Sequence, residues 1–264
     1  MIRHLSLILF LLITSPCAGA SLTVYDAGEG LLARINTAGS SIWIDTGSVI
    51  KIRENISKLQ TIAEPSPTDL ILTHLHPDHA SGIFELVERY PEINVYDNCM
   101  PGIGVEDGEL VRWIDEFLSS LKARYCLTDQ SSLVFNDIEV EVLWPTGNFR
   151  SKDHNYYSLV LRVSDGKTHV LMMGDANKKT EKWLLKNKLQ RLKGIDVLIV
   201  GHHGSASASS PEFLAAVDPK VAVVPVNSNN ARGYPSRETL ERIIQNGADL
   251  WVIGTDGDYR LEFE

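Results

Sequence analysis

Short apolar runs separated by polar turns recur along most of the chain. Runs of about four to eight residues bounded by glycine, asparagine or aspartate are typical of strands, and longer segments with apolar residues every three or four positions indicate helices. The expected strands are Leu22–Tyr25, Leu31–Ile35, Ser41–Ile44, Asp69–Thr73, Ile93–Tyr96, Ile138–Trp144, Ser158–Val163, His169–Met173, Val197–Val200, Val221–Val224, Leu250–Ile253 and Tyr259–Phe263. The expected helices are Val49–Ile62, Ala80–Tyr90, Leu110–Ala123, Lys178–Leu192, Pro211–Val217 and Ser236–Asn246.

The strands fall into two blocks, and each block carries its own helices. No low-complexity tract or linker separates the blocks. This pattern predicts an α/β protein in which two sheets pack face to face with helices outside. In the helix expected at Leu110–Ala123, a stripe of Trp113, Ile114, Phe117 and Leu121 is predicted to face the core.

The first twenty residues have the pattern of a targeting segment. Arg3 supplies a positive charge, Leu5–Ile13 is almost wholly apolar, and Ala18-Gly19-Ala20 suits cleavage beside small residues. The apolar run is too short for a membrane-spanning helix, although an uncleaved anchor is the alternative. We therefore expect a signal peptide at 1–20, an exported hydrolase domain at 21–264, and a periplasmic or secreted protein without a transmembrane segment in its mature part.

Charge and cysteine content refine this picture. The chain has 34 acidic and 25 basic residues, a formal net charge of −9, which disfavours loose coating of nucleic acid but allows a local basic groove. Beyond the targeting segment the cysteines are Cys99 and Cys126. In an oxidising compartment they either form a disulfide or remain two separate buried thiols.

The segment Thr73–His79 is the most informative local pattern, because it places three histidines and a carboxylate directly after an apolar run. Imidazole and carboxylate are ligands that zinc prefers. In an extended segment His74, His76 and Asp78 share one face, and His79 is turned toward a second position. One histidine pair can then hold one ion, and Asp78 with His79 can help to hold a neighbouring ion.

The order His-x-His-x-Asp-His after a hydrophobic strand resembles the signature of the metallo-β-lactamase superfamily. Four other segments are similar to motifs of that superfamily: Leu22–Gly30, Trp43–Gly47, Gly174-Asp175 and Val197–Ser205. Within the superfamily, the Asp-x-Gly-x-Gly opening, the His-His-Gly-Ser turn and the segment Thr255–Gly257 are most similar to the extracytoplasmic domain of ComEC-like DNA-uptake proteins. The resemblance implies a four-layer αββα sandwich.

The resemblance also implies the remaining metal ligands. Asp175 corresponds to a bridging aspartate, with a helix N-cap as its alternative role. His202 is preferred over His203 as the last ligand, and His203 then faces the substrate. The middle histidine of the family falls at His154; the alternatives are that Asn155 takes this position or that His154 is a solvent-facing loop residue. The expected set is His74, His76, Asp78, His79, His154, Asp175 and His202.

Substrate contacts are expected from His203, from Ser205 in the serine-rich turn, and from Arg232, whose guanidinium suits an anionic phosphate. For Ser205 a flexible polar loop is the competing interpretation, and for Arg232 a plain surface arginine.

The resulting hypothesis is a binuclear metal-dependent hydrolase. Two divalent ions, zinc by preference and manganese as the alternative, would activate a water that Asp78 orients as the catalytic residue. The expected substrate is a phosphodiester, either a small molecule or nucleic acid. The alternatives are a carbonyl substrate such as a lactam, lactone or thioester, and a non-catalytic metal-binding module. No partner protein is evident.

Overall fold

The computed structural model describes residues 19–28, 30–48, 66–100, 108–149, 151, 153–227 and 229–264. The predicted helix Val49–Ile62 and nearly all of the predicted signal peptide lie outside these ranges. None of the helices in the described ranges is both long and apolar enough to cross a membrane.

Two seven-stranded sheets form the centre of the molecule. The first sheet has the order β14-β1-β2-β3-β4-β5-β6, so the last strand along the chain pairs with the first. Its strands are β1 (Ser21–Val24), β2 (Ala33–Asn36), β3 (Ser41–Ile44), β4 (Asp69–Ile71), β5 (Asn94–Asp97), β6 (Arg124–Cys126) and β14 (Tyr259–Glu262).

The second sheet has the order β13-β12-β11-β10-β9-β8-β7. Its strands are β7 (Ser132–Phe135), β8 (Ile138–Trp144), β9 (Val160–Ser164), β10 (His169–Met172), β11 (Val197–Ile199), β12 (Val221–Val224) and β13 (Asp249–Val252). Buried aliphatic residues from both sheets, including Leu22, Ile44, Val140, Leu161 and Val170, form one cluster between them. The sheets therefore pack face to face, as expected.

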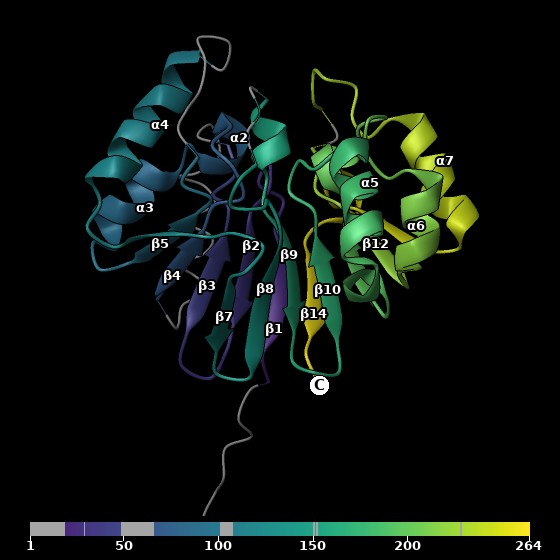
Figure 1. Cartoon of the computed structure of the whole chain (residues 1–264), viewed down its shortest axis with the longest axis horizontal. Coiled ribbons are helices and arrows are strands. Elements are labelled where there is room, and N and C mark those ends of the chain that lie inside the picture. The colour runs from purple at the N-terminus through teal and green to yellow at the C-terminus, as the bar shows by residue number, and fades with distance from the viewer. Residues whose placement is uncertain are drawn as a thin grey trace, which may run out of the picture.

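Helices cover the outer face of each sheet, which completes the four layers predicted for the fold (Figure 1). On the first sheet lie α3 (Ile83–Arg89) and α4 (Gly108–Ser120), and on the second lie α5 (Lys178–Asn187), α6 (Pro211–Val217) and α7 (Arg237–Asn246). The shorter helices are α2 (Pro77–Ala80), α8 (Ile253–Asp256), η2 (His154–Tyr157), η3 (Leu189–Leu192) and η4 (Gly201–Gly204).

Parallel pairing brings the ends of several strands to one edge of the molecule. Strands β3 to β6 of the first sheet are parallel to one another, and so are β10 to β13 of the second. Ligands in open α/β sheets bind beyond the carboxyl ends of such strands. The segments after β3, β4, β10, β11 and β12 carry the polar residues described below, and α2 lies at this edge (Figure 1).

Two helix predictions need correction near this edge. The helix expected at Ala80–Tyr90 is split into α2 and α3, because the Gly82 amide donates to Thr46 Oγ1 at 2.9 Å. The helix expected at Lys178–Leu192 ends as α5 at Asn187, and η3 follows it.

The face of α4 that packs on the core agrees with the prediction except at Trp113. Its buried residues are Val111, Ile114 and Leu118, whereas Trp113 is 51% exposed. Phe117 and Leu121 are partly buried and pack against the same core cluster as Ile114, so three of the four residues of the expected stripe face the core and Trp113 does not.

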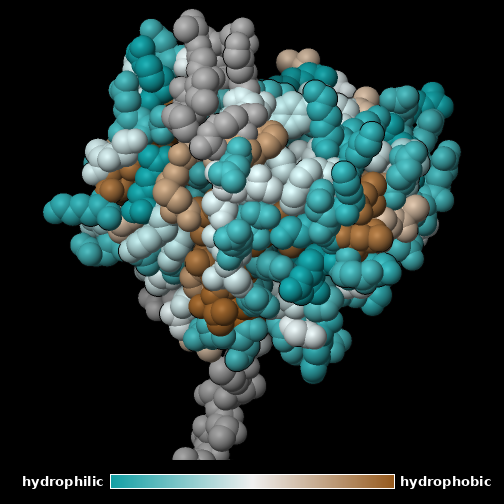
Figure 2. Space-filling model, in the orientation of Figure 1, coloured by the Kyte–Doolittle hydropathy of each residue, from teal (hydrophilic) through white to brown (hydrophobic). Residues whose placement is uncertain are grey.

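The short strands β6 and β7 were not expected from the sequence. Both are short and lie at sheet edges, and the sequence Ser132-Leu133-Val134-Phe135 of β7 does not alternate between polar and apolar residues. Figure 2 shows a mostly hydrophilic surface on this face with apolar residues gathered over β7, where Val134 is among the exposed ones.

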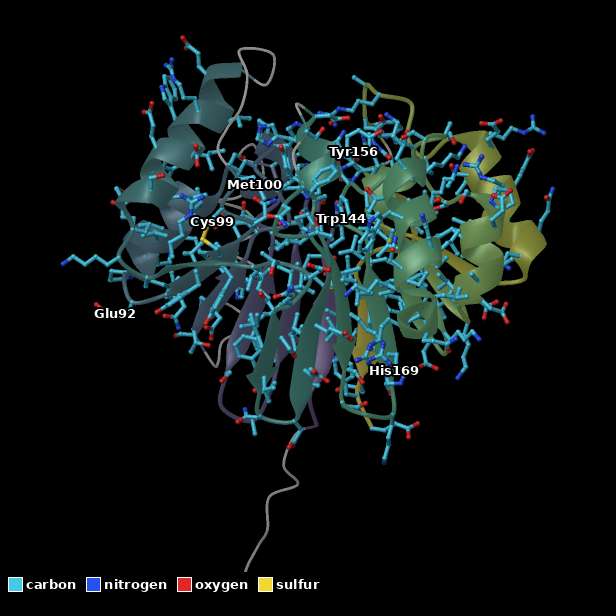
Figure 3. The ribbon with its side chains drawn as sticks, viewed as in Figure 1. Glu92, Cys99, Met100, Trp144, Tyr156 and His169 are labelled. Carbon is cyan, nitrogen blue, oxygen red and sulfur yellow. A yellow bond between two sulfur atoms is a disulfide. The ribbon has the colours of Figure 1, made fainter. Side chains whose placement is uncertain are left out.

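The sequence left open whether Cys99 and Cys126 form a disulfide. The structure joins them, with their Cα atoms 5.1 Å apart, and so ties the segment after β5 to the end of β6 (Figure 3). The alternative of two separate thiols is therefore excluded.

Candidate metal centre

His79 lies at the centre of the polar cluster beyond the strand ends. Its Nδ1 is 2.7 Å from Asp45 Oδ2, and the Asp45 carboxylate also accepts hydrogen bonds from the amide and hydroxyl of Thr73. This arrangement makes Nδ1 the donor, because a carboxylate only accepts. The unprotonated Nε2 of a neutral His79 then faces the side chains of Asp175 and His203.

His74 and His203 are oriented in the same way. His74 Nδ1 lies 3.2 Å from Thr73 Oγ1, and since that hydroxyl donates to Asp45, the imidazole must donate to it. His203 Nδ1 donates to the Pro225 carbonyl at 2.8 Å. In both residues Nε2 remains directed into the cluster. A hydrogen bond at the outer nitrogen is the usual way in which proteins orient metal-binding histidines.

The carboxylate of Asp175 lies close to the imidazoles of His74, His79 and His203. Its side chain is 1% exposed, and its oxygens lie 3.1 Å from His79 Nε2, 3.3 Å from His203 Nε2 and 3.7 Å from His74 Nε2. Neither oxygen accepts a hydrogen bond of regular geometry, and His74 Nε2 is also buried without a hydrogen-bond partner. Such buried polar atoms are costly unless something pairs with them.

A divalent cation fits this arrangement of donors. Around a tetrahedral zinc with ligand distances of about 2.0–2.1 Å, the ligand atoms are about 3.3 Å apart. Two overlapping groups in the described part of the chain have donor atoms within 4.8 Å of one another, and both include His79. The first adds His74 and Asp175, and the second adds Asp78 and His203.

The preference for His202 over His203 is not supported by the geometry. His203 is buried, and its Nε2 lies 3.5 Å from Asp78 and 3.3 Å from Asp175. His202 Nε2 is 3.8 Å from Asp175, 3.5 Å from the Tyr234 hydroxyl, and outside both donor groups. Both residues have left-handed backbone angles, which turns the second imidazole, rather than the first, inward.

His76 and His154 lie at the side of the cluster. Their ring centres are 5.7 Å apart, and His76 is 4.7 Å from the ring of His74. His154 is buried. Asn155 follows it in η2, and the backbone N–H of Asn155 donates to the Asp153 carboxylate. The structure thus brings His154 next to the histidine cluster through His76, outside the two tight donor groups.

Burial and charge divide the histidines into two classes. Burial holds the pKa of His74, His76 and His202 below the ordinary value of histidine. Burial also acts to lower the pKa of His79, but the carboxylates of Asp175 and Asp45 outweigh burial and raise that pKa. In the same way, Asp175 and Asp78 outweigh the burial of His203 and raise its pKa. In the absence of cations, the carboxylates of the cluster therefore favour protonation of His79 and His203.

The carboxylates respond in the opposite sense. Burial raises the pKa of Asp175, but the charges of His203 and His79 hold it well below its ordinary range. Burial likewise acts against ionisation of Asp78, whose pKa is lowered by its hydrogen bond to His203 and by the nearby His79. Both side chains are therefore ionised and available as ligands.

Arg232 and Tyr234 lie at the mouth of the cluster, on the segment after β12. Arg232 is half exposed, and its guanidinium donates to Asp78 Oδ2 at 3.1 Å. The Tyr234 ring is nearly parallel to the His203 ring, with 6.3 Å between centres. Together with Gly30, these residues line a narrow pocket that opens onto Asp78 and His203.

The serine-rich turn is less open to a ligand than expected. The amides of Ser209 and Ser210 both donate to the carboxylate of Glu181, so they are not available to a phosphate. Ser205 is buried, with its hydroxyl 3.0 Å from that of Ser207. Only Arg232 of the predicted substrate contacts thus has an exposed charged group at the mouth of the cluster.

Asp45 belongs to this cluster through its contact with His79, and the sequence did not single it out. It belongs to the segment Trp43–Gly47, which was noted only as an opening motif. Its position directly after β3 could have identified it. Because β3 is the parallel neighbour of β4, the residues that follow the two strands lie close together. His169, by contrast, lies at the opposite end of the strands from Tyr156 (Figure 3).

Comparison with known proteins agrees with this geometry. Residues 31–227 match the family model described as the metallo-beta-lactamase superfamily. The chain is 31% identical over 245 residues to a competence protein, ComA, from Neisseria gonorrhoeae, an alignment that covers 92% of this chain and 32% of that protein. It is 27% identical over 246 residues to recombination protein 2 from Haemophilus influenzae, covering 90% of this chain and 28% of that protein.

The chain thus spans about a third of the length of these relatives. Among solved structures, its fold is similar to that of YhfI, a metallo-β-lactamase fold protein from Bacillus subtilis, with a TM-score of 0.60 and 14% identity. That match covers 92% of this chain and 99% of the other. The predicted family and sandwich fold are confirmed. The chain belongs to the metallo-β-lactamase superfamily and is a metal-dependent hydrolase with competence-protein homologues.

Proposed function

We propose that this hydrolase cleaves a phosphodiester at a centre that holds two divalent ions, zinc by preference. His74, His76, His154 and Asp175 would hold one ion, and Asp78, His79, His203 and Asp175 the other. This assignment keeps the predicted set except that His203 replaces His202. Bound ions would supply Lewis-acid polarisation and favour ionisation of a water near neutral pH.

The observation that carries the substrate proposal is the cation at the mouth of the centre. The Arg232 guanidinium lies 3.1 Å from Asp78 and is 47% exposed, so it can turn from that carboxylate to an anionic substrate. Arginine suits phosphate because its planar donors can bind two oxygens at once. A neutral lactam, lactone or thioester would offer Arg232 no comparable partner. The names of the two relatives, competence and recombination proteins, further support nucleic acid as the phosphodiester.

The side chains would divide the work according to their charges. Asp78 is ionised and faces both His203 and Arg232, so it can accept a hydrogen bond from the attacking water and orient it. Arg232 would stabilise the charge on the phosphoryl oxygens. Tyr234, beside both histidines, would limit the access of bulk water to that position.

A substrate screen tests the proposal. Metal-loaded protein should hydrolyse bis(p-nitrophenyl) phosphate, and activity should disappear after chelation and return with zinc or manganese. Arg232→Ala should raise KM for the phosphodiester by roughly tenfold, the expected loss for one exposed charge-assisted contact. Hydrolysis of nitrocefin, a lactone or a thioester in place of the phosphodiester would favour the carbonyl alternative. Bound metal without turnover of any of these would favour a binding module.

We also propose that the domain acts outside the cytoplasm after removal of residues 1–20. The disulfide supports this proposal, because such bonds persist in oxidising compartments. Mass spectrometry of protein from the periplasm or the medium should find Ser21 at the amino terminus. An intact Met1 on envelope-bound protein would contradict it.

A further inference from the structure

A second pocket, with a volume of about 300 Å³, lies beside the candidate metal centre. Its size is near the lower end for small-ligand pockets, which hold roughly 300–1,000 Å³. Aromatic rings make up most of its wall, and a serine, a lysine and a threonine complete it. These lining residues are Trp144, Phe149, Ser151, Tyr156, Lys179, Thr180 and Trp183.

The aromatic wall is held in place by contacts among its own members. Trp144 is 3% exposed, and its indole Nε1 donates to the Tyr156 carbonyl at 2.7 Å. Its ring centre is 4.4 Å from that of Phe149 and 4.8 Å from that of Trp183. Phe149, Tyr156 and Trp183 are only half buried, so they present ring surface to whatever enters the pocket. The wall suits a flat ligand with a π-face.

Two polar groups add further requirements for the ligand. Thr180 is 1% exposed, and its hydroxyl is buried without a hydrogen-bond partner. A ligand with a hydrogen-bonding edge would supply that partner. Lys179 lies at the rim, with its Nζ 4.7 Å from the centre of the Tyr156 ring and its side chain open to solvent. A negative charge on the ligand would therefore be favoured there.

The pocket shares its supporting segments with the metal centre. Helix η2 carries His154 toward the histidine cluster and Tyr156 toward the pocket, two residues further along. The segment after β10 carries Asp175, and its continuation into α5 carries Lys179 and Thr180. Two residues span at most ~7 Å of chain, comparable with two stacked nucleotides at ~3.4 Å each. Figure 3 shows Trp144 and Tyr156 near the same end of the strands as Met100.

We propose that this pocket binds a nucleobase of a single-stranded nucleic acid whose phosphodiester lies at the metal centre. The inference rests on the proposed phosphodiesterase function and adds the class of substrate. A nucleobase has the π-face, the hydrogen-bonding edge and the adjoining phosphate that the wall, Thr180 and Lys179 respectively require. An aromatic side chain of a peptide has no negatively charged phosphate beside it for Lys179. The ring of phenylalanine also has no hydrogen-bonding edge for Thr180. In a chain with a net charge of −9, the exposed Lys178-Lys179 pair provides a local attraction.

The test compares oligothymidylate with an abasic oligomer of the same length and charge. Metal-loaded wild-type protein should cleave oligothymidylate with a kcat/KM about tenfold higher, an effect within the range for stacking of one base. Trp183→Ala should bring the ratio of the two kcat/KM values close to one, and Trp183→Phe should restore part of it. Trp113→Ala, which removes a half-exposed tryptophan on α4, is the matched control and should keep the wild-type ratio.

A surface variant covers the case in which Trp183→Ala does not fold. Lys179→Gln removes a fully exposed charge, so it should fold normally, weaken oligomer binding, and reduce the salt dependence of that binding. Binding is measured without cleavage through quenching of tryptophan fluorescence by a nuclease-resistant phosphorothioate oligothymidylate. The abasic phosphorothioate oligomer should quench far less.

The outcomes separate this inference from the function on which it rests. Efficient hydrolysis of both oligomers with equal kcat/KM would overturn the base pocket while supporting the phosphodiesterase. Absence of hydrolysis would count against the phosphodiesterase, and the quenching titration would still decide whether the pocket binds a base. Quenching by a phenylalanine-containing peptide but not by oligothymidylate would overturn the inference in favour of a peptide ligand.

Discussion

The two histidines of the turn after β11 differ in what their imidazoles contact, and this difference can be measured. His203→Ala removes an Nε2 that faces both Asp78 and Asp175, so we expect purified protein to lose about one of two bound ions. His202→Ala should keep its metal, because His202 lies outside both donor groups. Elemental analysis of both variants, with His169→Ala as a control from the opposite end of β10, provides the measurement. If His202→Ala lost metal and His203→Ala did not, the result would support His202 as the metal ligand, as the sequence predicted.

Asp45 acts on the metal centre through the ring of His79. We expect Asp45→Asn to weaken metal binding by roughly 10–100-fold, the usual effect of removing a carboxylate that orients a metal-binding histidine. The substitution keeps the size of the side chain but removes the charge that holds the Nδ1 proton. Competition with a chromophoric chelator measures the affinity. Unchanged affinity in a folded variant would show that Thr73 and packing are sufficient to orient the ring.

Metal affinity should depend on pH because His79 and His203 must release protons to become ligands. Nearby carboxylates raise the pKa of both above the ordinary histidine value in the metal-free protein. Protons on these residues therefore compete with the metal up to a higher pH than at an ordinary histidine, and affinity should rise as pH increases. Calorimetric titration in buffers of different ionisation enthalpy should detect proton release on binding. Binding without proton release at neutral pH would contradict the assignment.

At the level of elements, the turn between β1 and β2 touches the metal-binding loop directly. A Cβ on Gly30 would lie 1.5 Å from the Asp78 carbonyl oxygen, and the backbone there has a φ of +98°. Gly30→Ala should therefore displace Asp78, destabilise the protein by about 3 kcal/mol, and lower both bound metal and activity. Gly39→Ala is the matched control, since its Cβ would meet only one atom, at 4.0 Å. Urea unfolding measures the stability of both variants, and equal stability would refute the proposed close contact.

The sequence predicted the elements whose periodicity is strong and missed those formed mainly by tertiary contacts. Helix α6 has the predicted bounds, because Pro211 begins it. The break between α2 and α3 depends on a hydrogen bond from Gly82 to Thr46, which lies 36 residues away and leaves no local signal. The same limit applies to the site. The motif identified His74, Asp78 and His79 as candidate ligands. The inward orientation of the His203 ring goes with left-handed backbone conformations at His202 and His203, which their residue types do not predict.

At the scale of the whole molecule, the disulfide adds stability to the first sheet. Cys99 and Cys126 are 27 residues apart, and in a chain-entropy model closing such a loop stabilises the fold by ~3.5 kcal/mol. The double variant Cys99→Ser/Cys126→Ser should therefore melt roughly 7–14 °C lower than the wild type. Calorimetry with and without reductant measures the effect. Reductant should lower the melting temperature of the wild type only, and equal melting of all samples would argue against the bond.

The candidate metal donors come from both sheets, with His74, Asp78 and His79 following β4 of the first and Asp175 and His203 following β10 and β11 of the second. An ion bound by them would therefore connect the two halves of the sandwich, and its site would form only while the two sheets remain packed. Ligands that bind the native state alone stabilise it by about 4 kcal/mol at a thousandfold excess over Kd. The supply of metal would then control how long the protein resists proteolysis as well as how active it is. Metal deficiency would therefore reduce the amount of the enzyme and not only its activity.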